Sequence, residues 1–168
     1  MRYVVFFRGI NVGKANRIKI SDIASMMGRH FGSVISHGQS GNFLFDSDMK
    51  KEEIVPLIGS SFSKEFGFEA ACIIRSTEEL RKAADGNPFP EAAGDRMFFT
   101  FMSGESSSQK TGEWERGGDI AKLAFDVVYL RCEGEYHKTK LSNNFFEKEL
   151  GVVCTTRNRN VVEAVLKK

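Results

Sequence analysis

SVISHGQSGNFLFD, residues 33–46, is the stretch that decides the fold class. Two short runs rich in β-branched and aromatic residues flank GQSGN, residues 38–42, whose two glycines are typical of a hairpin turn. Upstream, YVVFF at residues 3–7 is apolar without polar alternation, which predicts a strand buried on both faces.

Helices predicted around this hairpin complete the first half of the chain. SDIASMMGRHF, residues 21–31, predicts a helix capped by its first two residues, and residues 48–66 predict a second one. FEAACIIR, residues 68–75, predicts a fourth strand, and Ser76 with Glu79 predicts a capping box at the next helix start. The order strand, helix, strand, strand, helix, strand is the ferredoxin-like pattern.

The second half repeats this order of elements in the prediction. We predict strands at 97–102, 126–132, 135–140 and 152–156, helices at 142–150 and from 157 onward, and a helix or long loop at 106–117. No similarity between individual residues of the two halves is evident, so the repetition rests on element order. We therefore predict an α+β protein of two ferredoxin-like βαββαβ(α) halves, with antiparallel or mixed sheets packed against helices. The halves would span residues 1–85 and 96–168, with a Pro- and Gly-bearing linker at 86–95.

The positive charge of the chain is concentrated at its beginning. The formal net charge of the 168 residues is only +2, which argues against a protein that coats nucleic acid by bulk electrostatics. Residues 1–20 hold five basic residues and no acid, so the remainder carries a net charge of −3. A cationic site is therefore expected near the first loop.

The cysteines and the hydropathy pattern indicate the cellular compartment of the protein. Cys72, Cys132 and Cys154 form no CxxC pair and lie in apolar stretches, so we expect buried thiols with neither a disulfide framework nor a zinc site. The apolar run at 3–7 is too short for a signal peptide, and no stretch approaches the ~20 apolar residues of a membrane span. We predict a cytoplasmic protein that does not enter a membrane, and the oligomeric state stays open.

The predicted topology brings two polar loops to one edge of the first sheet. Strands 1 and 2 of a ferredoxin-like sheet run parallel, so the loop at 8–19 and the hairpin turn at 38–42 emerge together. The candidate ligand-binding residues at this corner are Arg8, Asn11, Gly13, Asn16, Arg17, Gln39, Ser40 and Asn42. Further candidates, Lys140, Arg157 and Asn158, lie next to predicted helix starts, where free amides favour anions.

Several more specific sites are excluded by spacing. Gly9 to Gly13 is one residue short of a Walker loop, Ala15 replaces the hydroxyl that would hold magnesium, and the helix starts too late. Two interpretations of this loop stay open. It could bind an anion through backbone amides and basic side chains, or it could be a solvated basic loop whose glycines only shape turns. No histidine has metal-ligand spacing, so we expect no metal and no cofactor, and nothing assigns a nucleophile or a base.

Four stretches resemble a known family: FFRGINVGKANRIKIS at 6–21, QSGN at 39–42, NPF at 87–89, and LSNNFFEKELGVVCTTRN at 141–158. The sequence is similar to a widespread, mostly bacterial domain of unknown function, number 1697. The resemblance implies two similar α/β halves of ferredoxin-like character, with no established activity. The polar positions that it implies are shared are Arg8, Asn11, Gly13, Asn16, Gln39, Ser40, Gly41, Asn42, Lys140, Thr156, Arg157 and Asn158. Lys14-Ala15 and Arg159-Asn160-Val161 depart from the family pattern.

Three functions compete at this stage. The first is binding of, or action on, an anionic or phosphorylated small molecule at the corner of residues 8–17 and 38–42. The second is nucleic-acid binding through the same patch, extended by Lys140 and Arg157. The third is a structural, homodimeric interaction protein without catalysis. Whether the protein is an enzyme is left open.

Overall fold

The predicted hairpin forms with its glycine turn. Strand β2 (Val34–His37) pairs antiparallel with strand β3 (Asn42–Asp46). Gly38 and Gly41 in the turn adopt φ angles of 66° and 78°, in the left-handed region that glycine enters without a steric penalty. The glycine spacing therefore predicted the turn correctly.

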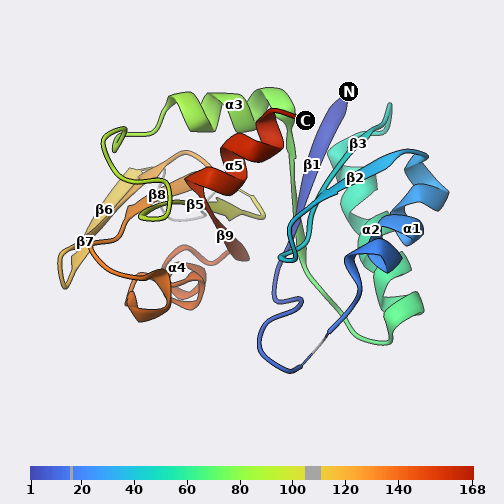
Figure 1. The fold of residues 1–168 in the computed structure, drawn as a ribbon, viewed down its shortest axis with the longest axis horizontal. Coiled ribbons are helices and arrows are strands. Elements are labelled where there is room, and N and C mark those ends of the chain that lie inside the picture. Colours follow the sequence, from blue (N-terminus) through green and yellow to red (C-terminus); the bar gives the residue numbers. More distant parts are fainter. Residues whose placement is uncertain (16, 105–110) are drawn as a thin grey trace. The chain divides into compact units, whose positions relative to one another are not determined.

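Figure 1 shows the chain, a computed structural model in which residues 1–15, 17–104 and 111–168 are described. The chain divides into two compact units, Met1–Glu79 and Leu80–Lys168. Each unit has its own antiparallel sheet. The protein is thus α+β, as predicted.

Among its described residues, the first unit forms a four-stranded sheet with two helices packed on one face (Figure 1). The strand order is β2-β3-β1-β4, and neighbouring strands are antiparallel. Strand β1 (Arg2–Phe7) therefore runs parallel to β2, and helix α1 (Ile20–Phe31) connects them. Helix α2 (Lys51–Phe66) connects β3 to β4 (Cys72–Ser76). This connectivity is the ferredoxin-like one.

The core of the first unit lies between the sheet and these helices. Tyr3, Val5 and Phe7 share one face of β1, because strand side chains alternate, and they pack with residues of the helices. The buried residues that join them are Ile10, Ile20, Ile23, Met26, Met27, Phe43, Phe45, Ile54, Ile58, Phe62, Cys72 and Ile74. Val4 and Phe6, on the opposite face, are fully buried too, as the unbroken apolar run predicted.

The capping signals in the sequence predicted the start of one helix correctly and the start of another incorrectly. Helix α3 (Thr77–Asp85) begins at the predicted capping box: the Ser76 N–H donates to Glu79 Oε2 at 2.7 Å, and the Glu79 N–H donates to Ser76 Oγ at 3.1 Å. The predicted cap of α1 at residues 21–22 is wrong, because Lys19 occupies the N-cap position and α1 begins at Ile20. Burying an isoleucine contributes about 1.5–3 kcal/mol, more than the roughly 1 kcal/mol of a serine cap.

The described part of the second unit forms a five-stranded antiparallel sheet in the order β6-β7-β8-β5-β9. Its strands in chain order are β5 (Met97–Met102), β6 (Thr111–Arg116), β7 (Asp119–Ala124), β8 (Val127–Arg131) and β9 (Cys154–Asn158). Helix α4 (Asn143–Leu150) precedes β9 and helix α5 (Arg159–Leu166) follows it. Ser142 caps α4 as predicted, because its hydroxyl accepts a hydrogen bond from the Phe145 N–H.

The hairpin predicted between residues 126–132 and 135–140 does not form, and β8 pairs with an earlier strand instead. EYHKTK, residues 135–140, was expected as a strand but contains the 3₁₀ turn η1 (Tyr136–Lys138). Strand β8 instead pairs with β7, across a two-residue turn formed by Phe125 and Asp126. The periodicity of DIAKLA, with alternate residues buried, is the strand signal that the prediction missed.

The segment that we predicted as a helix or long loop, 106–117, contains a strand in its described residues. Residues 105–110 of the predicted 106–117 segment lie outside them, and residues 111–116 form the edge strand β6. Most of β6 is exposed. An edge strand with a solvated face tolerates polar residues, so the composition of β6 does not resemble that of a buried strand.

Similar pentapeptides occupy equivalent positions in the two units. CIIRS, residues 72–76, forms β4, and CTTRN, residues 154–158, forms β9. Each is an edge strand in the described part of its sheet and pairs antiparallel with the first strand of its unit, β1 or β5. The residue that follows β1 or β5 donates its N–H to the carbonyl of the residue before the pentapeptide, from Arg8 to Ala71 at 2.8 Å and from Ser103 to Val153 at 2.9 Å.

The side chains of these pentapeptides also correspond. Arg75 and Arg157 are both buried, and the Nη1 of each donates to the carbonyl oxygen of the preceding residue, at 2.8 and 2.9 Å. Ser76 and Asn158 each accept a hydrogen bond from the first turn of the helix that follows. These matches are consistent with a duplicated fold at the level of residues, which the sequence alone did not reveal.

The three cysteines are buried free thiols, as predicted. Burial raises the pKa of the Cys72 thiol to about 12. Burial, with a smaller effect of the Asp119 carboxylate, raises the pKa of Cys132 to about 11. Since the thiolate is the nucleophile, neither of these two residues is suited to covalent chemistry near neutral pH.

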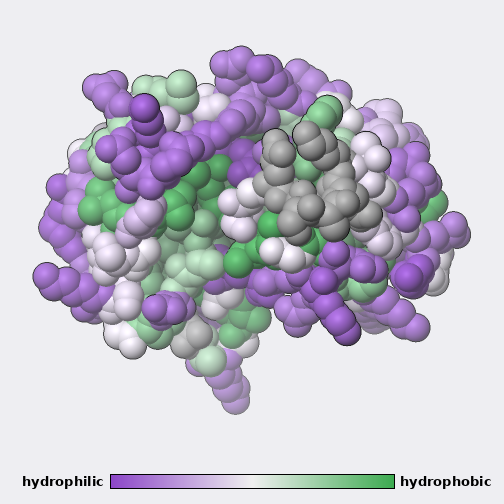
Figure 2. All heavy atoms as spheres, turned by 180° about the vertical axis from the view of Figure 1, so that it is seen from behind, coloured by the Kyte–Doolittle hydropathy of each residue, from purple (hydrophilic) through white to green (hydrophobic). Residues whose placement is uncertain are grey.

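The surface is largely hydrophilic on the face that Figure 2 shows, with apolar patches between the polar side chains. Among the described residues, the exposed large apolar side chains are Met1, Val12, Ile35 and Phe125. Within the described ranges, we find no helix with the length and apolar character needed to cross a membrane.

Candidate functional site

The two loops of the predicted corner are in contact within the first unit. The Phe7 N–H donates to the Gly41 carbonyl at 2.9 Å, and Asn11 Nδ2 donates to the Gln39 carbonyl at 3.2 Å. A Cβ atom built on Gly41 would lie 2.6 Å from Ile10 Cδ1. The glycine therefore lets the turn approach the loop more closely than a residue with a Cβ atom could without a shift of its neighbours.

Asn11 organises the loop through three side-chain hydrogen bonds. Its Oδ1 accepts a hydrogen bond from the Ile18 N–H at 2.8 Å, and its Nδ2 donates to the Ile18 carbonyl at 2.9 Å in addition to Gln39. The side chain thus links position 11 to position 18 across the loop. The φ angle of Asn11 is +54°, a conformation that asparagine tolerates better than most residues.

Asn11 and Phe125 are the non-glycine residues with positive φ in the described part of the chain, and glycine substitutions at these positions should have opposite effects. Phe125, at φ +57° and 72% exposed, loses little contact when replaced, so Phe125→Gly should raise the free energy of unfolding by about 0.5–1 kcal/mol through relief of strain. Asn11→Gly should lower it by about 1–2 kcal/mol, because three hydrogen bonds are lost. Urea denaturation measures both, and destabilisation by Phe125→Gly would contradict the strain argument.

The remaining predicted residues of the turn also serve its architecture. Asn42 is fully buried, and its Nδ2 donates to the His37 carbonyl at 2.8 Å and to Ser40 Oγ at 3.1 Å. Ser40, although exposed, therefore accepts a hydrogen bond within the turn. Gly13 is exposed with φ +63°, and Asn16 lies outside the described residues.

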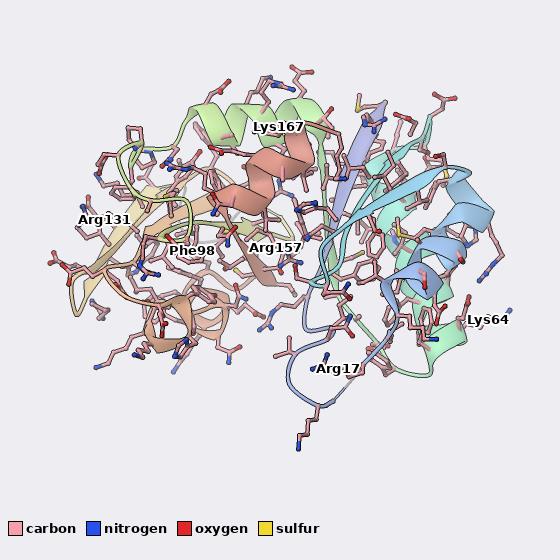
Figure 3. All side chains as sticks on the ribbon, viewed as in Figure 1. Arg17, Lys64, Phe98, Arg131, Arg157 and Lys167 are labelled. Carbon is pink, nitrogen blue, oxygen red and sulfur yellow. The ribbon has the colours of Figure 1, made fainter. Side chains whose placement is uncertain are left out.

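A cationic hollow lies between the loop and the turn. Its volume is ≈ 260 Å³, it is open to solvent, and its lining residues are Asn11, Arg17, Ile18, Lys19 and Gln39. Arg17 extends from the loop between β1 and α1 (Figure 3), and its Nε donates to the Gly13 carbonyl at 2.8 Å. This bond involves Nε and orients the guanidinium. Neither Arg17 nor Lys19 forms an ion pair with another described residue.

A second hollow continues from the first. Its volume is ≈ 490 Å³, and it shares Lys19 and Gln39 with the cationic hollow. The residues that it adds are Ile20, Ser21, Ser36 and Gly38. Hydroxyl and amide groups therefore line the space beside the cations.

Arg8 is placed differently from the other basic residues of the loop. It directly follows β1, it is half-buried, and its N–H donates to the Ala71 carbonyl. It lines neither of the two hollows. The prediction thus included Arg8 at the corner but omitted Lys19, Ser21 and Ser36, which do line them. The acid-free run up to Lys19 was the available signal for the lysine.

The C-terminal candidates belong to the second unit and have structural partners. Arg157 is only 7% exposed, and its Nη1 donates to Thr155 Oγ1 at 2.8 Å and to the Thr156 carbonyl at 2.9 Å. Asn158 caps α5 by accepting from the Val161 N–H at 2.9 Å. Lys140 is exposed in the segment before α4. Arg157 therefore adds no exposed charge to a binding surface.

In the described ranges, no group of three His, Cys, Asp or Glu residues is arranged to hold a metal ion. The polar chemistry of the corner is therefore that of cations, amides and hydroxyls. Such a set of groups binds anions and hydroxyl-bearing molecules by charge and hydrogen bonding.

Comparisons with known proteins concern the fold and the family. A family model described as "Protein of unknown function (DUF1697)" matches residues 1–129. A solved structure, of the conserved bacterial protein SP0830 from Streptococcus pneumoniae, resembles the chain with a TM-score of 0.69 and 18% identity. The alignment covers 99% of this chain and 97% of the other. None of the curated proteins matches.

Proposed function

The chain belongs to the DUF1697 family of proteins of unknown function, and we propose that its first unit binds a small phosphate-bearing ligand in the cationic hollow. The observation that supports the proposal is the placement of Arg17 and Lys19 in one hollow, with the guanidinium oriented by the Gly13 carbonyl. A planar guanidinium whose Nε is engaged still offers its terminal N–H groups to phosphate oxygens.

The strength of this site is limited by its exposure to solvent. Exposed ion pairs contribute about 0.2–1 kcal/mol each, because water and salt screen them. Asp22 lies in the first turn of α1, three residues after Lys19, and its negative charge works against an anion. Inorganic phosphate alone should therefore bind weakly, with a Kd no tighter than about 1 mM, the affinity that corresponds to about 4 kcal/mol.

Inorganic phosphate should stabilise the protein, and the double variant Arg17→Ala/Lys19→Ala should lose at least about tenfold in affinity. The reason is that charge-assisted hydrogen bonds from two cations are removed together. Isothermal titration calorimetry and thermal melts of the full chain, at matched ionic strength in chloride, measure the effect.

Matched variants separate this site from general charge effects. Lys148→Ala, at an exposed position of α4, should leave phosphate binding unchanged. Asp22→Asn should tighten it, since a nearby negative charge is removed. Equal stabilisation by phosphate and chloride, or no response at all in the unmodified chain, rules the proposal out.

Nucleic-acid binding through the same surface is the second candidate, and the charge of +5 in residues 1–20 is the observation that favours it. The buried position of Arg157 removes one of the cations on which that extended patch depended. Binding of an oligonucleotide would show a slope of log K against log salt of about −0.7 to −0.9 per neutralised phosphate. A slope of several units at physiological salt would favour this candidate over a small ligand.

A cytoplasmic location is part of the proposal. The support is that Cys72, Cys132 and Cys154 are free thiols, which suits a reducing compartment.

A further inference from the structure

We infer that the ligand is a phosphorylated sugar or polyol rather than a nucleotide, an inference that rests on the proposed function. The evidence is the chemistry of the second hollow, which continues from the cationic one through Lys19 and Gln39. A ligand with its phosphate at Arg17 extends its remaining atoms into that space.

The sizes of the two hollows fit a ligand with two parts. Small-molecule sites commonly occupy about 300–1,000 Å³. At ≈ 260 Å³ the cationic hollow is below that range and suits a single anionic group, whereas the second, at ≈ 490 Å³, suits the body of a small molecule. The phosphate would occupy the cationic hollow, and the rest of the ligand the second one.

The lining of the second hollow favours hydroxyl groups. Ser21 and Ser36 offer hydroxyls that donate and accept, and Gln39 offers an amide that does both. The Gln39 carbonyl of the main chain is engaged by Asn11, so the turn is held in place independently of the Gln39 side chain. These groups match the alternating donors and acceptors of a sugar or polyol chain.

The same lining disfavours a nucleobase. Proteins commonly bind bases by stacking them on aromatic side chains. The described residues that line the two hollows include no Phe, Tyr, Trp or His. The apolar lining consists of Ile18 and Ile20, which provide no planar surface for stacking. A base would therefore gain little beyond the contacts of its sugar and phosphate.

The test compares four probes with the full chain: inorganic phosphate, glycerol 3-phosphate, ribose 5-phosphate and adenosine monophosphate. Ribose 5-phosphate should bind about tenfold more tightly than inorganic phosphate, since two added hydrogen bonds contribute on that scale. Adenosine monophosphate should bind no more tightly than ribose 5-phosphate. Calorimetric titration at constant ionic strength gives the four affinities.

Two variants locate the gain in affinity. Ser36→Ala together with Ser21→Ala should reduce the ratio of ribose 5-phosphate to inorganic phosphate affinity toward one, because both hydroxyls line only the second hollow. Arg17→Ala should weaken every probe. Thermal melts without ligand show that the serine variants remain folded.

The possible failures are distinguishable. If inorganic phosphate binds but sugar phosphates bind no more tightly, the inference is wrong and the proposed anion site stands. If adenosine monophosphate binds more tightly than ribose 5-phosphate, the ligand class is nucleotides and the inference is again wrong. If no probe binds, the proposed function itself fails, and the inference fails with it.

Discussion

Replacing Phe62 by alanine should lower the free energy of unfolding by about 3–5 kcal/mol, the range for deleting a fully buried phenylalanine. Phe62 is 0% exposed on α2, and its ring centroid lies 5.2 Å from that of Phe7, 4.8 Å from Phe66 and 5.3 Å from Phe68. Alanine would leave a cavity where α2 packs against β1. Urea denaturation followed by circular dichroism measures the change in midpoint.

Phe62→Leu serves as the matched control for this prediction. Leucine retains most of the apolar volume, so the loss should be less than half that of alanine. An alanine variant that loses under about 1 kcal/mol would show that the first unit collapses around the deleted ring.

Gly41→Ala should be nearly as damaging, at about 2–5 kcal/mol. The left-handed backbone, at φ +78°, costs an alanine about 1–2 kcal/mol. The new methyl group would also lie 2.6 Å from Ile10 Cδ1 and 2.9 Å from Phe7 Cβ, and overpacking of this kind costs about 1–3 kcal/mol. Because Ile10 belongs to the loop at 8–19, phosphate binding at the corner should weaken as well.

Gly13→Ala separates the two components of this prediction. Gly13 has a similar φ of +63°, but a Cβ atom there would meet nothing within 4 Å. Its alanine variant should therefore lose only the backbone component, about 1–2 kcal/mol. Equal losses at Gly41 and Gly13 would show that the contact with Ile10 relaxes without cost. Thermal melts of both variants provide the comparison.

The first unit was predicted well because its signals are local. The apolar run of β1, the glycines at 38 and 41, and the capping box of Ser76 with Glu79 each act within a few residues of chain. The cap of α1 was missed because the burial of Ile20, a tertiary contact, outweighed a local preference.

The second unit was predicted less well for a similar reason. Strand β6 is mostly exposed and polar, so its identity as a strand depends on pairing with β7 and not on its own composition. The correspondence of CIIRS with CTTRN was also invisible along the chain, because only the strand registers align the two pentapeptides.

The sequence by itself determined the α+β class, the hairpin that specifies the first half, and the positive charge of the first loop. The tertiary structure decided which charged residues are available at a surface. Arg17 and Lys19 line a hollow. Arg157, in contrast, is buried and donates a hydrogen bond to the Thr156 carbonyl of its own strand. Spacing along the chain fixes secondary structure through short-range sterics and hydrogen bonds, but the burial of a side chain depends on what long-range packing places over it.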